Sequence, residues 1–465
     1  MAIGTDQLDV VVYDAPGLGD RSYLVHDGRV GAVIDAQRDP GPYLATAAGL
    51  GVEIALVLET HVHNDYVSGG LALARRVGAV YGIPAGEPVR FGAESDALDE
   101  GDVRTVGSLA LRVLATPGHT PHHLSYLFED VHGARAVLTG GSLLAGATGR
   151  TDLLGPDLAA ELAAAQWRSV RRLLGELPPG TCVLPTHGFG SFCASGGDVH
   201  GPVSDLTVEV ERRHNPAARL ELEAFVESLA SDALPVPAYY RHMAPLNRAG
   251  APEPGTAPVP VVAPASLAAL ERTGAALVDI RGRRSFSHAH RRGALNIELG
   301  PNLPVYLGWL LPFTAPVVLV ATDLDEVSEA RRLLASIGRE SLAGWAIDGF
   351  VGSLAPEERG HYRVQDFRQL AERCRHQPVP RVLDVRFPYE WRSGHIPGAR
   401  NVPLPEVASA LPALPDDQEI WVHCAGGFRA AIAASLLSAN HLRPVLIDDT
   451  FEGALAAGLE VVTGT

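Results

Sequence analysis

Histidines and an aspartate gather where apolar segments end in the first part of the chain. Residues 54–59 form an apolar run, and the next segment, Thr60-His-Val-His-Asn-Asp-Tyr66, carries two histidines and an aspartate at spacings of two. His119 and His187 each follow a later apolar run. Imidazole rings and a carboxylate on adjoining strand ends can converge on one ion. We therefore predict a divalent metal site formed by His61, His63 and His119, with Asp65 or His187 as a fourth ligand.

A thiol occupies a second segment with the features of a reactive site. An apolar strand is expected at residues 419–422 and an Ala-rich helix at 430–437, and between them stands His423-Cys-Ala-Gly-Gly-Phe-Arg429. Loop N–H groups and the helix N-terminus stabilise a thiolate over a thiol. We predict Cys424 as the nucleophile, Arg429 as a fixed positive charge, and a cradle made by Ala425, Gly426, Gly427 and Phe428. The alternative is a buried structural cysteine.

The other three cysteines are expected to play lesser parts. Cys193 follows the His187 loop closely enough to face the same cavity, so it is a candidate second thiol that accepts sulfur. Cys182 lies in an apolar strand and Cys374 in an amphipathic helix, where both would serve packing. Four scattered cysteines are too few for a disulfide framework in a chain of 465 residues.

Composition excludes several classes of function. All 38 basic residues other than histidine are arginine, which removes Schiff-base lysines and P-loop lysines. The net charge of −16 disfavours binding to nucleic acid. The sequence lacks a long apolar segment and an N-terminal signal pattern, so we expect a soluble cytoplasmic protein that does not enter a membrane.

The elements that must position these residues fall into several domains. Short apolar runs at 8–13, 22–26 and 30–34 predict antiparallel strands, and alternating strands and helices follow, including a helix over 158–174 and a strand over 182–184. We assign residues 1–215 to one α/β domain and residues 216–262 to a helical and Pro-rich linker.

An internal repeat with a spacing of 105 residues marks the rest of the chain. Asp279-Ile-Arg, Phe286, His290, Gly293-Ala294 and Asn296 correspond to Asp384-Val-Arg, Trp391, His395, Gly398-Ala399 and Asn401. Such a register predicts two copies of one small α/β domain, at about 263–350 and 362–465.

The second copy resembles rhodanese sulfurtransferases. The resemblance rests on Asp384-Val-Arg, Glu390-Trp391, Gly394-His-Ile-Pro-Gly-Ala and the Cys424 loop. It implies that Cys424 takes up sulfane sulfur as a persulfide, held by the loop amides and Arg429. The first copy has Ala321-Thr-Asp-Leu-Asp-Glu326 at the corresponding loop and no cysteine, so we interpret it as a degenerate rhodanese domain with a structural role. The alternative is that this domain keeps a binding role although it has lost sulfur transfer.

The order of the histidine segments resembles the metallo-β-lactamase fold, in its glyoxalase II and persulfide dioxygenase branch. Gly149-Arg-Thr-Asp152 is also similar to that branch. With the two rhodanese-like copies, the layout resembles persulfide dioxygenase–rhodanese fusions. This resemblance implies an α/β fold in which a metallo-β-lactamase αββα sandwich precedes two rhodanese-like domains. It also implies a mononuclear metal, iron(II) with zinc as the alternative, that oxidises a low-molecular-weight thiol persulfide with O2 to sulfite and the thiol.

Two positions depart from the family pattern. Tyr66 stands where the motif has histidine, and Gly141 stands where the family has an aspartate that is an iron ligand in the dioxygenases and a bridging ligand in the dinuclear hydrolases. Losing both ligands argues against a dinuclear site. His122 and His123 are candidates for a replacement ligand, although two histidines beside a strand more often lie at the surface or support the ligands from behind.

The leading hypothesis is a two-centre enzyme of sulfur metabolism, acting in sulfide detoxification, in which persulfide oxidation is coupled to sulfur transfer through Cys424. One alternative is a sulfurtransferase whose first domain is an inactive binding module or scaffold. Another is a thioester hydrolase of glyoxalase II type. The expected partners are a thiol persulfide, O2, and thiosulfate or sulfite, and a homo-oligomer is left open.

Overall fold

The computed structural model describes residues 2–5, 8–195, 206–231, 234–255, 257–376 and 378–464. The chain forms two compact units. The first is Met1–Gly255 with Arg332–Glu340, and the second is Thr256–Arg331 with Ser341–Thr465. Most of the segment predicted as a linker is helical and belongs to the first unit. Within the described residues, no helix combines the length and the apolar character needed to span a membrane.

Two sheets form the centre of the first unit. The larger sheet follows the chain order, with antiparallel pairs up to β4 and parallel pairs after it: β1 (Ala2–Thr5), β2 (Leu8–Ala15), β3 (Asp20–His26), β4 (Val30–Ile34), β5 (Glu53–Leu58), β6 (Val80–Pro84) and β7 (Asp96–Leu98). The second sheet has the order β14 (Cys182–Pro185), β11 (Gly133–Gly140), β10 (Leu124–Asp130), β9 (Leu109–Ala115) and β8 (Val103–Val106). A small third sheet joins β12 (Leu143–Leu144), β13 (Ala147–Gly149) and β15 (Ala194–Ser195).

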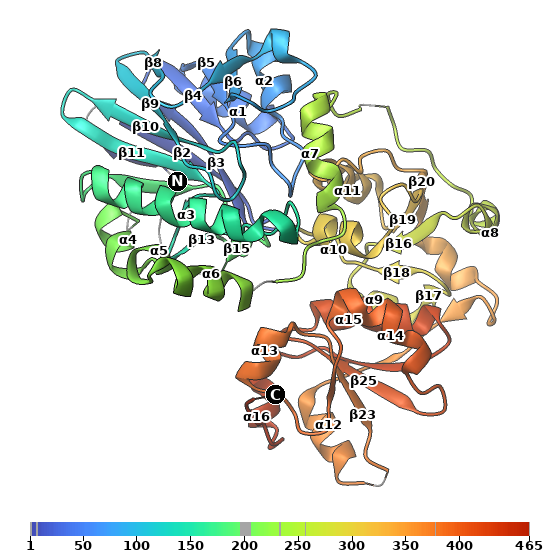
Figure 1. The fold of residues 1–465 in the computed structure, drawn as a ribbon. Helices are drawn as coiled ribbons and strands as arrows, with labels where there is room; N and C mark the ends of the chain where they lie inside the picture. The colour runs from blue at the N-terminus through green and yellow to red at the C-terminus, as the bar shows by residue number, and fades with distance from the viewer. Residues whose placement is uncertain are drawn as a thin grey trace. The chain divides into compact units, whose positions relative to one another are not determined.

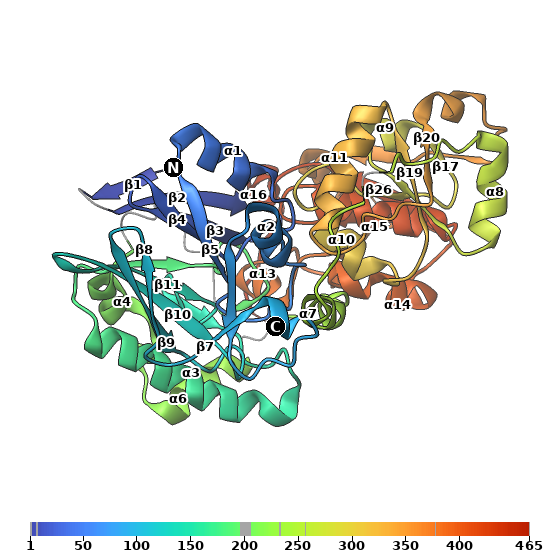
Figure 2. The same cartoon turned by 90° about the horizontal axis from the view of Figure 1, so that it is seen from above.

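The two large sheets pack face to face, and helices cover their outer faces (Figures 1 and 2). Because side chains alternate across a strand, one face of each sheet supplies the central core, which includes Tyr23, Leu58, Val113 and Phe128. The outer helices are α1 (Gly41–Leu50) and α2 (Gly70–Val77) on the larger sheet, and α3 (Pro156–Glu176), α4 (Val208–His214), α5 (Pro216–Arg219) and α6 (Leu222–Ser231) on the second. This order of layers confirms the αββα sandwich that the sequence predicts.

The candidate ligands all lie at strand ends in this sandwich. His61, His63 and Asp65 follow β5 of the larger sheet, whereas His119 follows β9 and His187 follows β14 of the second sheet. The helix α7 (Tyr240–Ala249) also belongs to this unit, and its Asn247 side chain donates hydrogen bonds to the carbonyl oxygens of His63 and Tyr66, both at 2.9 Å. The loops from the two sheets therefore meet at one edge of the sandwich.

The second unit contains two parallel sheets. The first has the order β18 (Leu295–Asn296), β16 (Ala276–Asp279), β19 (Val317–Ala321) and β20 (Gly344–Ile347), and the second has the order β22 (Arg363–Gln365), β26 (Arg443–Ile447), β25 (Glu419–His423), β23 (Arg381–Asp384) and β24 (Arg400–Asn401). A short pair joins β17 (His290–Arg291) to β21 (Arg359–Gly360). The helices are α8 (Pro264–Arg272), α9 (Arg283–His288), α10 (Leu303–Leu310), α11 (Leu324–Ala335, which runs into the 332–340 segment of the first unit), α12 (Phe367–Cys374), α13 (Pro388–Ser393), α14 (Val407–Ala410), α15 (Phe428–Ala439) and α16 (Glu452–Ala456). We call the part with the first sheet the middle domain and the part with the second sheet the third domain.

The repeated residues make the same contacts in both of these domains. Arg281 and Arg386 each pair with the aspartate two residues earlier, with Nη2–Oδ2 distances of 2.7 and 2.6 Å. In each domain an asparagine side chain, Asn296 or Asn401, donates to the backbone carbonyl oxygens of both the aspartate and the arginine of that pair. His290 stacks on Phe286 and His395 on Trp391, with ring centroids 3.9 and 3.8 Å apart. The repeated residues therefore form the same framework of buried polar contacts in both domains.

We predict that Arg386→Ala lowers the free energy of unfolding of the second unit by about 3–5 kcal/mol, because it leaves the buried Asp384 carboxylate without its ion pair. Four of the five tryptophans lie in this unit, so tryptophan fluorescence during chemical denaturation reports its unfolding. The exposed Arg392→Ala is the control and should change little. Equal stability of the two variants would contradict a structural role for the pair.

Candidate functional site

Three buried histidines meet at the edge of the sandwich, and each has its Nδ1 atom held by a different partner. The Nδ1 atom of His61 lies 2.9 Å from Thr60 Oγ1, that of His119 lies 2.8 Å from the carbonyl oxygen of Arg150, and that of His187 lies 2.8 Å from Asp20 Oδ1. The Thr60 hydroxyl gives its own hydrogen to Asp35 Oδ2 at 2.8 Å, so it accepts from His61. A carbonyl and a carboxylate accept from the other two rings.

These partners set the tautomer of all three rings. With the proton on Nδ1, each Nε2 atom carries a lone pair that is available to a cation. The Nε2 atoms of His61 and His187 lie 3.4 Å apart, and one ligand atom from each of the three histidines falls within 4.8 Å of the others. Among the described residues, the Nε2 atom of His119 has no hydrogen-bond partner. Three converging lone pairs suit a divalent metal ion.

Burial keeps these rings neutral. It lowers the pKa of His61, His119 and His187 below that of free histidine. Neighbouring imidazoles lower the pKa of His61 and His119 further, whereas Asp65 opposes part of the decrease at His187. Burial also raises the pKa of Asp20 and of Asp65 to about 7. Asp65 Oδ2 lies 3.3 Å from the Nδ1 atom of His187, so two carboxyl groups stand behind that ring. Together these groups offer neutral nitrogen donors with carboxyl groups close by.

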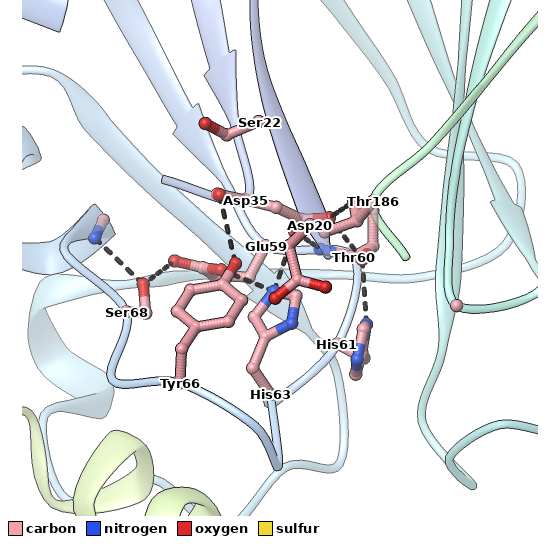
Figure 3. Close-up of polar contacts among 12 residues, drawn as sticks. Asp20, Ser22, Asp35, Glu59, Thr60, His61, His63, Tyr66, Ser68 and Thr186 are labelled. Atoms are coloured by element: carbon pink, nitrogen blue, oxygen red, sulfur yellow. Dashed lines mark hydrogen bonds and ion pairs between the residues drawn. The ribbon is translucent and has the colours of Figure 1, made fainter. Parts of the chain in front are cut away.

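The ring of His63 has different neighbours from the other three. Its Nε2 atom lies 3.2 Å from Asp35 Oδ1 and 3.3 Å from Glu59 Oε2, and Figure 3 shows these three side chains together. Burial alone would lower the pKa of His63, but the two carboxylates outweigh it and raise this pKa to about 10. Tyr66, which replaces the histidine of the family motif, stacks on His63 at 4.3 Å between ring centroids. His63 therefore forms a charged pair with these carboxylates, although one of its nitrogens still lies within 4.8 Å of ligand atoms of Asp65 and His187.

Gly141 is essential to the position of His119. A Cβ atom at residue 141 would lie 2.2 Å from Cδ2 of His119, so the imidazole fills the space that a side chain would need. The N–H of Gly141 donates to Nε2 of His123 at 3.0 Å, and Nδ1 of His123 lies 2.9 Å from Thr116 Oγ1. Both nitrogens of His123 are thus engaged by protein groups, and His122 is exposed. These contacts place His123 behind the ligand rings as a supporting residue.

We predict that Gly141→Ala destabilises the first unit by about 1–3 kcal/mol, because the new methyl group collides with a buried ring that is held from behind. Gly175→Ala is the matched control, since position 175 lies in α3 with open space around it. This substitution should raise the free energy of unfolding by about 0.5–1 kcal/mol. Thermal and chemical unfolding measure both variants. Unchanged stability in Gly141→Ala would show that His119 does not depend on the glycine.

Cys193 lies close to this cluster, as the sequence suggests. It is buried, and its thiol interacts with the Tyr240 hydroxyl and lies within electrostatic range of Asp65 and Asp20. Burial raises the pKa of Cys193 well above its ordinary value, which favours the thiol over the thiolate. A cavity of about 260 Å³ lies beside the loop of residues 60–66, with Asn64, Tyr240 and Arg241 among its lining residues. A small molecule in this cavity would contact that loop.

The Cys424 loop forms between β25 and α15. The carbonyl oxygen of Ala425 accepts from the N–H of Phe451 at 2.9 Å, and that of Gly426 accepts from Arg283 Nη1 at 3.3 Å. In a trans peptide the N–H points away from the carbonyl of the same peptide group. The N–H groups of Gly426 and Gly427 therefore point away from Phe451 and Arg283, which bind these carbonyls. Gly427 adopts φ +86°, which lets the chain turn into α15 directly after the loop. Cys424 itself is buried, with 1% of its surface exposed.

Arg429 forms an ion pair with a carboxylate that the sequence analysis did not assign to the site. Its Nη1 and Nη2 atoms donate to the two oxygens of Glu390, both at 2.6 Å. Burial opposes the charge, but the Glu390 hydrogen bonds outweigh it and raise the pKa of Arg429. The expected fixed positive charge is therefore half of a bidentate ion pair.

The corresponding loop of the middle domain is closed by its own side chains. The N–H of Thr322 donates to Glu326 Oε2 at 2.8 Å, and the N–H of Glu326 donates to Asp323 Oδ1 at 2.9 Å. Carboxylates thus accept hydrogen bonds from backbone N–H groups that an anion-binding loop would direct at the sulfur. The amides of Thr322 and Glu326 are therefore engaged by side chains of the same loop.

Comparisons with known proteins agree with both halves of this description. Residues 16–187 match the metallo-beta-lactamase superfamily, and residues 364–456 match the rhodanese-like domain. A hydroxyacylglutathione hydrolase from Methylococcus capsulatus is 34% identical over 245 residues, which cover 52% of this chain and 90% of that protein. The chain belongs to the metallo-beta-lactamase superfamily. It joins this domain to a C-terminal rhodanese-like domain.

Two further relatives bear on this metallo-beta-lactamase superfamily member. Human mitochondrial persulfide dioxygenase ETHE1 is 29% identical over 235 residues, covering 50% of this chain and 81% of that protein. A crystal structure described as a metallo-beta-lactamase from Staphylococcus aureus matches with a TM-score of 0.64 and 26% identity, covering 73% of this chain and 99% of that one. The resemblance to persulfide dioxygenases is thereby supported, and sulfur metabolism and a glyoxalase II-like activity are the two functions these relatives indicate.

Sequence reasoning missed the residues that hold the ligands in place. Asp20 opens β3, Thr60 directly precedes His61, and Arg150 contributes a backbone oxygen. Of these, Thr60 could have been noticed as the neighbour of a predicted ligand, and Glu390 as part of the Glu390-Trp391 motif. Asp20 gives no local signal, because it lies 167 residues from His187 in the chain.

Proposed function

We propose that this protein is a two-centre sulfur enzyme. The first domain oxidises a low-molecular-weight thiol persulfide with O2 at a divalent metal, and Cys424 carries sulfane sulfur as a persulfide. The observation that supports this proposal is that one chain holds both a set of converging neutral imidazoles and a buried thiol in the loop that turns through Gly427 into α15. The relatives named as persulfide dioxygenase and rhodanese-like are consistent with it.

His61, His119 and His187 would hold the metal. Three neutral imidazoles are a known donor set for zinc and also suit iron(II), and the resemblance to persulfide dioxygenases favours iron. A bound divalent ion would supply a Lewis acid and, as iron, a centre for reaction with O2. Thr60, Arg150 and Asp20 keep the three rings in the tautomer that binds metal, and Asp65 places a second carboxyl group beside His187.

At the second centre the thiolate of Cys424 attacks the outer sulfur of a persulfide R–S–SH. The donor S–S bond breaks, a new S–S bond forms on Cys424, and the electron pair leaves with R–S⁻. Cys424 lies at the start of the loop that turns through Gly427 into α15, so the sulfur would sit near the N-terminus of this helix. The Arg429–Glu390 pair fixes the start of α15 against α13.

A thioester hydrolase of glyoxalase II type is the second candidate, since several relatives carry the name hydroxyacylglutathione hydrolase. Such an enzyme uses two metals bridged by the aspartate that Gly141 replaces. His119 fills that space, which disfavours a dinuclear centre.

The function is tested with protein purified without oxygen. Metal analysis should find about one divalent ion per chain, and a thiol persulfide added to the same sample should drive O2 uptake and sulfite release. Sulfur transfer without O2 uptake would instead support a sulfurtransferase with an inactive first domain. Anaerobic release of thiol from a thioester would support the hydrolase.

The ligand set yields a direct prediction about metal content. His187→Ala should leave the purified protein nearly free of metal, and Asp20→Asn should weaken metal affinity by about 10–100-fold, because the asparagine amide no longer fixes the His187 ring as a carboxylate does. His122→Ala is the matched control at an exposed histidine. Wild-type metal content in His187→Ala would exclude this ligand set.

For the second centre, we predict that Cys424→Ala abolishes sulfur transfer while the fold and the metal content stay unchanged. Mass spectrometry of the protein after exposure to a persulfide donor detects the sulfur added to Cys424. Cys374→Ala, at a half-buried cysteine on α12, is the control and should retain transfer. Persistent transfer in Cys424→Ala would overturn the assignment.

A further inference from the structure

We propose that Asn64 and Arg241 bind the thiol that carries the persulfide sulfur to the first domain. The two side chains favour a carrier that has both an amide and a carboxylate group, as a cysteine-containing peptide does. This inference rests on the proposed oxidation of a thiol persulfide and adds the class of carrier to it.

The cavity of about 260 Å³ beside the loop of residues 60–66 has a wall of mixed character. Its apolar and polar lining residues are, in chain order, Asn64, Leu153, Val236, Pro237, Ala238, Tyr240 and Arg241. None of these described lining residues is acidic. A mostly apolar cavity with a few polar groups is typical of a site for a small organic molecule.

Asn64 places an amide group at this cavity. It lies between His63 and Asp65 in the loop of residues 60–66, and only 7% of its surface is exposed. Its side-chain amide has no hydrogen-bond partner among the described residues. Water or a ligand in the cavity must therefore satisfy this amide. An amide of the ligand matches it best, because it offers one donor and one acceptor in return.

Arg241 is exposed and supplies positive charge to the same cavity. Its Nε atom donates to Nε2 of the neighbouring His242 at 3.3 Å, and no carboxylate among the described residues forms an ion pair with it. Arg248 on the same helix pairs with Glu87 at 3.0 Å. In a chain with a net charge of −16, an arginine that lines a cavity without a carboxylate partner favours an anionic ligand. A carboxylate suits the planar guanidinium group.

Helix α7 is fastened to the loop that carries Asn64. Its Asn247 side chain donates to the carbonyl oxygens of His63 and Tyr66, both at 2.9 Å. The spacing between Asn64 and Arg241 is therefore set by the fold. A carrier bound by both side chains would lie against that loop, next to the proposed metal site.

The test measures the binding of two unreactive carriers to the full-length protein with its metal bound. S-methylglutathione has amide and carboxylate groups, and its diethyl ester keeps the amides without the negative charges of the carboxylates. Isothermal titration calorimetry should find that wild type binds the acid about tenfold more tightly than the ester. Arg241→Gln should abolish this preference by weakening the acid alone, whereas Arg241→Lys keeps the charge and should retain most of it.

A second variant tests the amide contact. Asn64→Ala should weaken the binding of both carriers by about fivefold, because both keep their amides. If Asn64→Ala does not fold, Asn64→Asp carries the same comparison with the ester, because it keeps the size of the side chain and removes the donor. Arg168→Gln is the matched control at an exposed arginine on α3 that does not line the cavity, and it should bind both carriers as wild type does.

The outcomes separate this inference from the function on which it rests. Equal affinity of wild type for the acid and the ester, binding of neither, or unchanged affinities in Arg241→Gln or Asn64→Ala would overturn the carrier site. Preferential binding of the acid without persulfide-dependent O2 uptake would keep the carrier site and defeat the proposed oxidation. O2 uptake with an unchanged KM for glutathione persulfide in Arg241→Gln would keep the oxidation and overturn the carrier site.

Discussion

The orientation of three imidazole rings is the constraint on which the first domain depends. Each ring must present its Nε2 lone pair to a common point, and it does so because Thr60, Arg150 and Asp20 each accept the Nδ1 proton. Asp35 extends this arrangement, since it binds the Thr60 N–H and hydroxyl as well as the Thr186 hydroxyl. These groups come from both sheets of the sandwich, so the site forms only when the two sheets pack together.

The loss of the family aspartate has a structural consequence beyond one missing ligand. With glycine at position 141, the ring of His119 packs directly on the backbone, and the Gly141 N–H is held by His123. His63, for its part, is held by two carboxylates and covered by Tyr66. The site therefore presents neutral imidazoles with carboxyl groups around them, and under the proposed function this arrangement favours one metal over two.

Sequence patterns revealed the framework better than the site. The strand-end histidines and the repeat were predictable, because apolar runs and paired motifs are local signals, whereas the αββα sandwich was predicted only from the resemblance to the metallo-β-lactamase fold. Asp384, Arg386, His395 and Asn401 are recognisable since they build the fold, and their partners lie within 17 residues. The contacts of Asp20 with His187 and of Tyr306 with Phe428 were not predictable, because each joins segments more than 100 residues apart that meet only through tertiary packing.

The central claim is that the imidazoles of His61, His119 and His187 hold the metal of the first domain and that Gly141 supplies no ligand. X-ray absorption spectroscopy of the protein loaded with its metal under anaerobic conditions reports the nearest ligands directly. The account predicts a first shell with three imidazole nitrogens, and loss of one of them in His187→Ala. A first shell dominated by carboxylate oxygens, or one that is unchanged in His187→Ala, would contradict it.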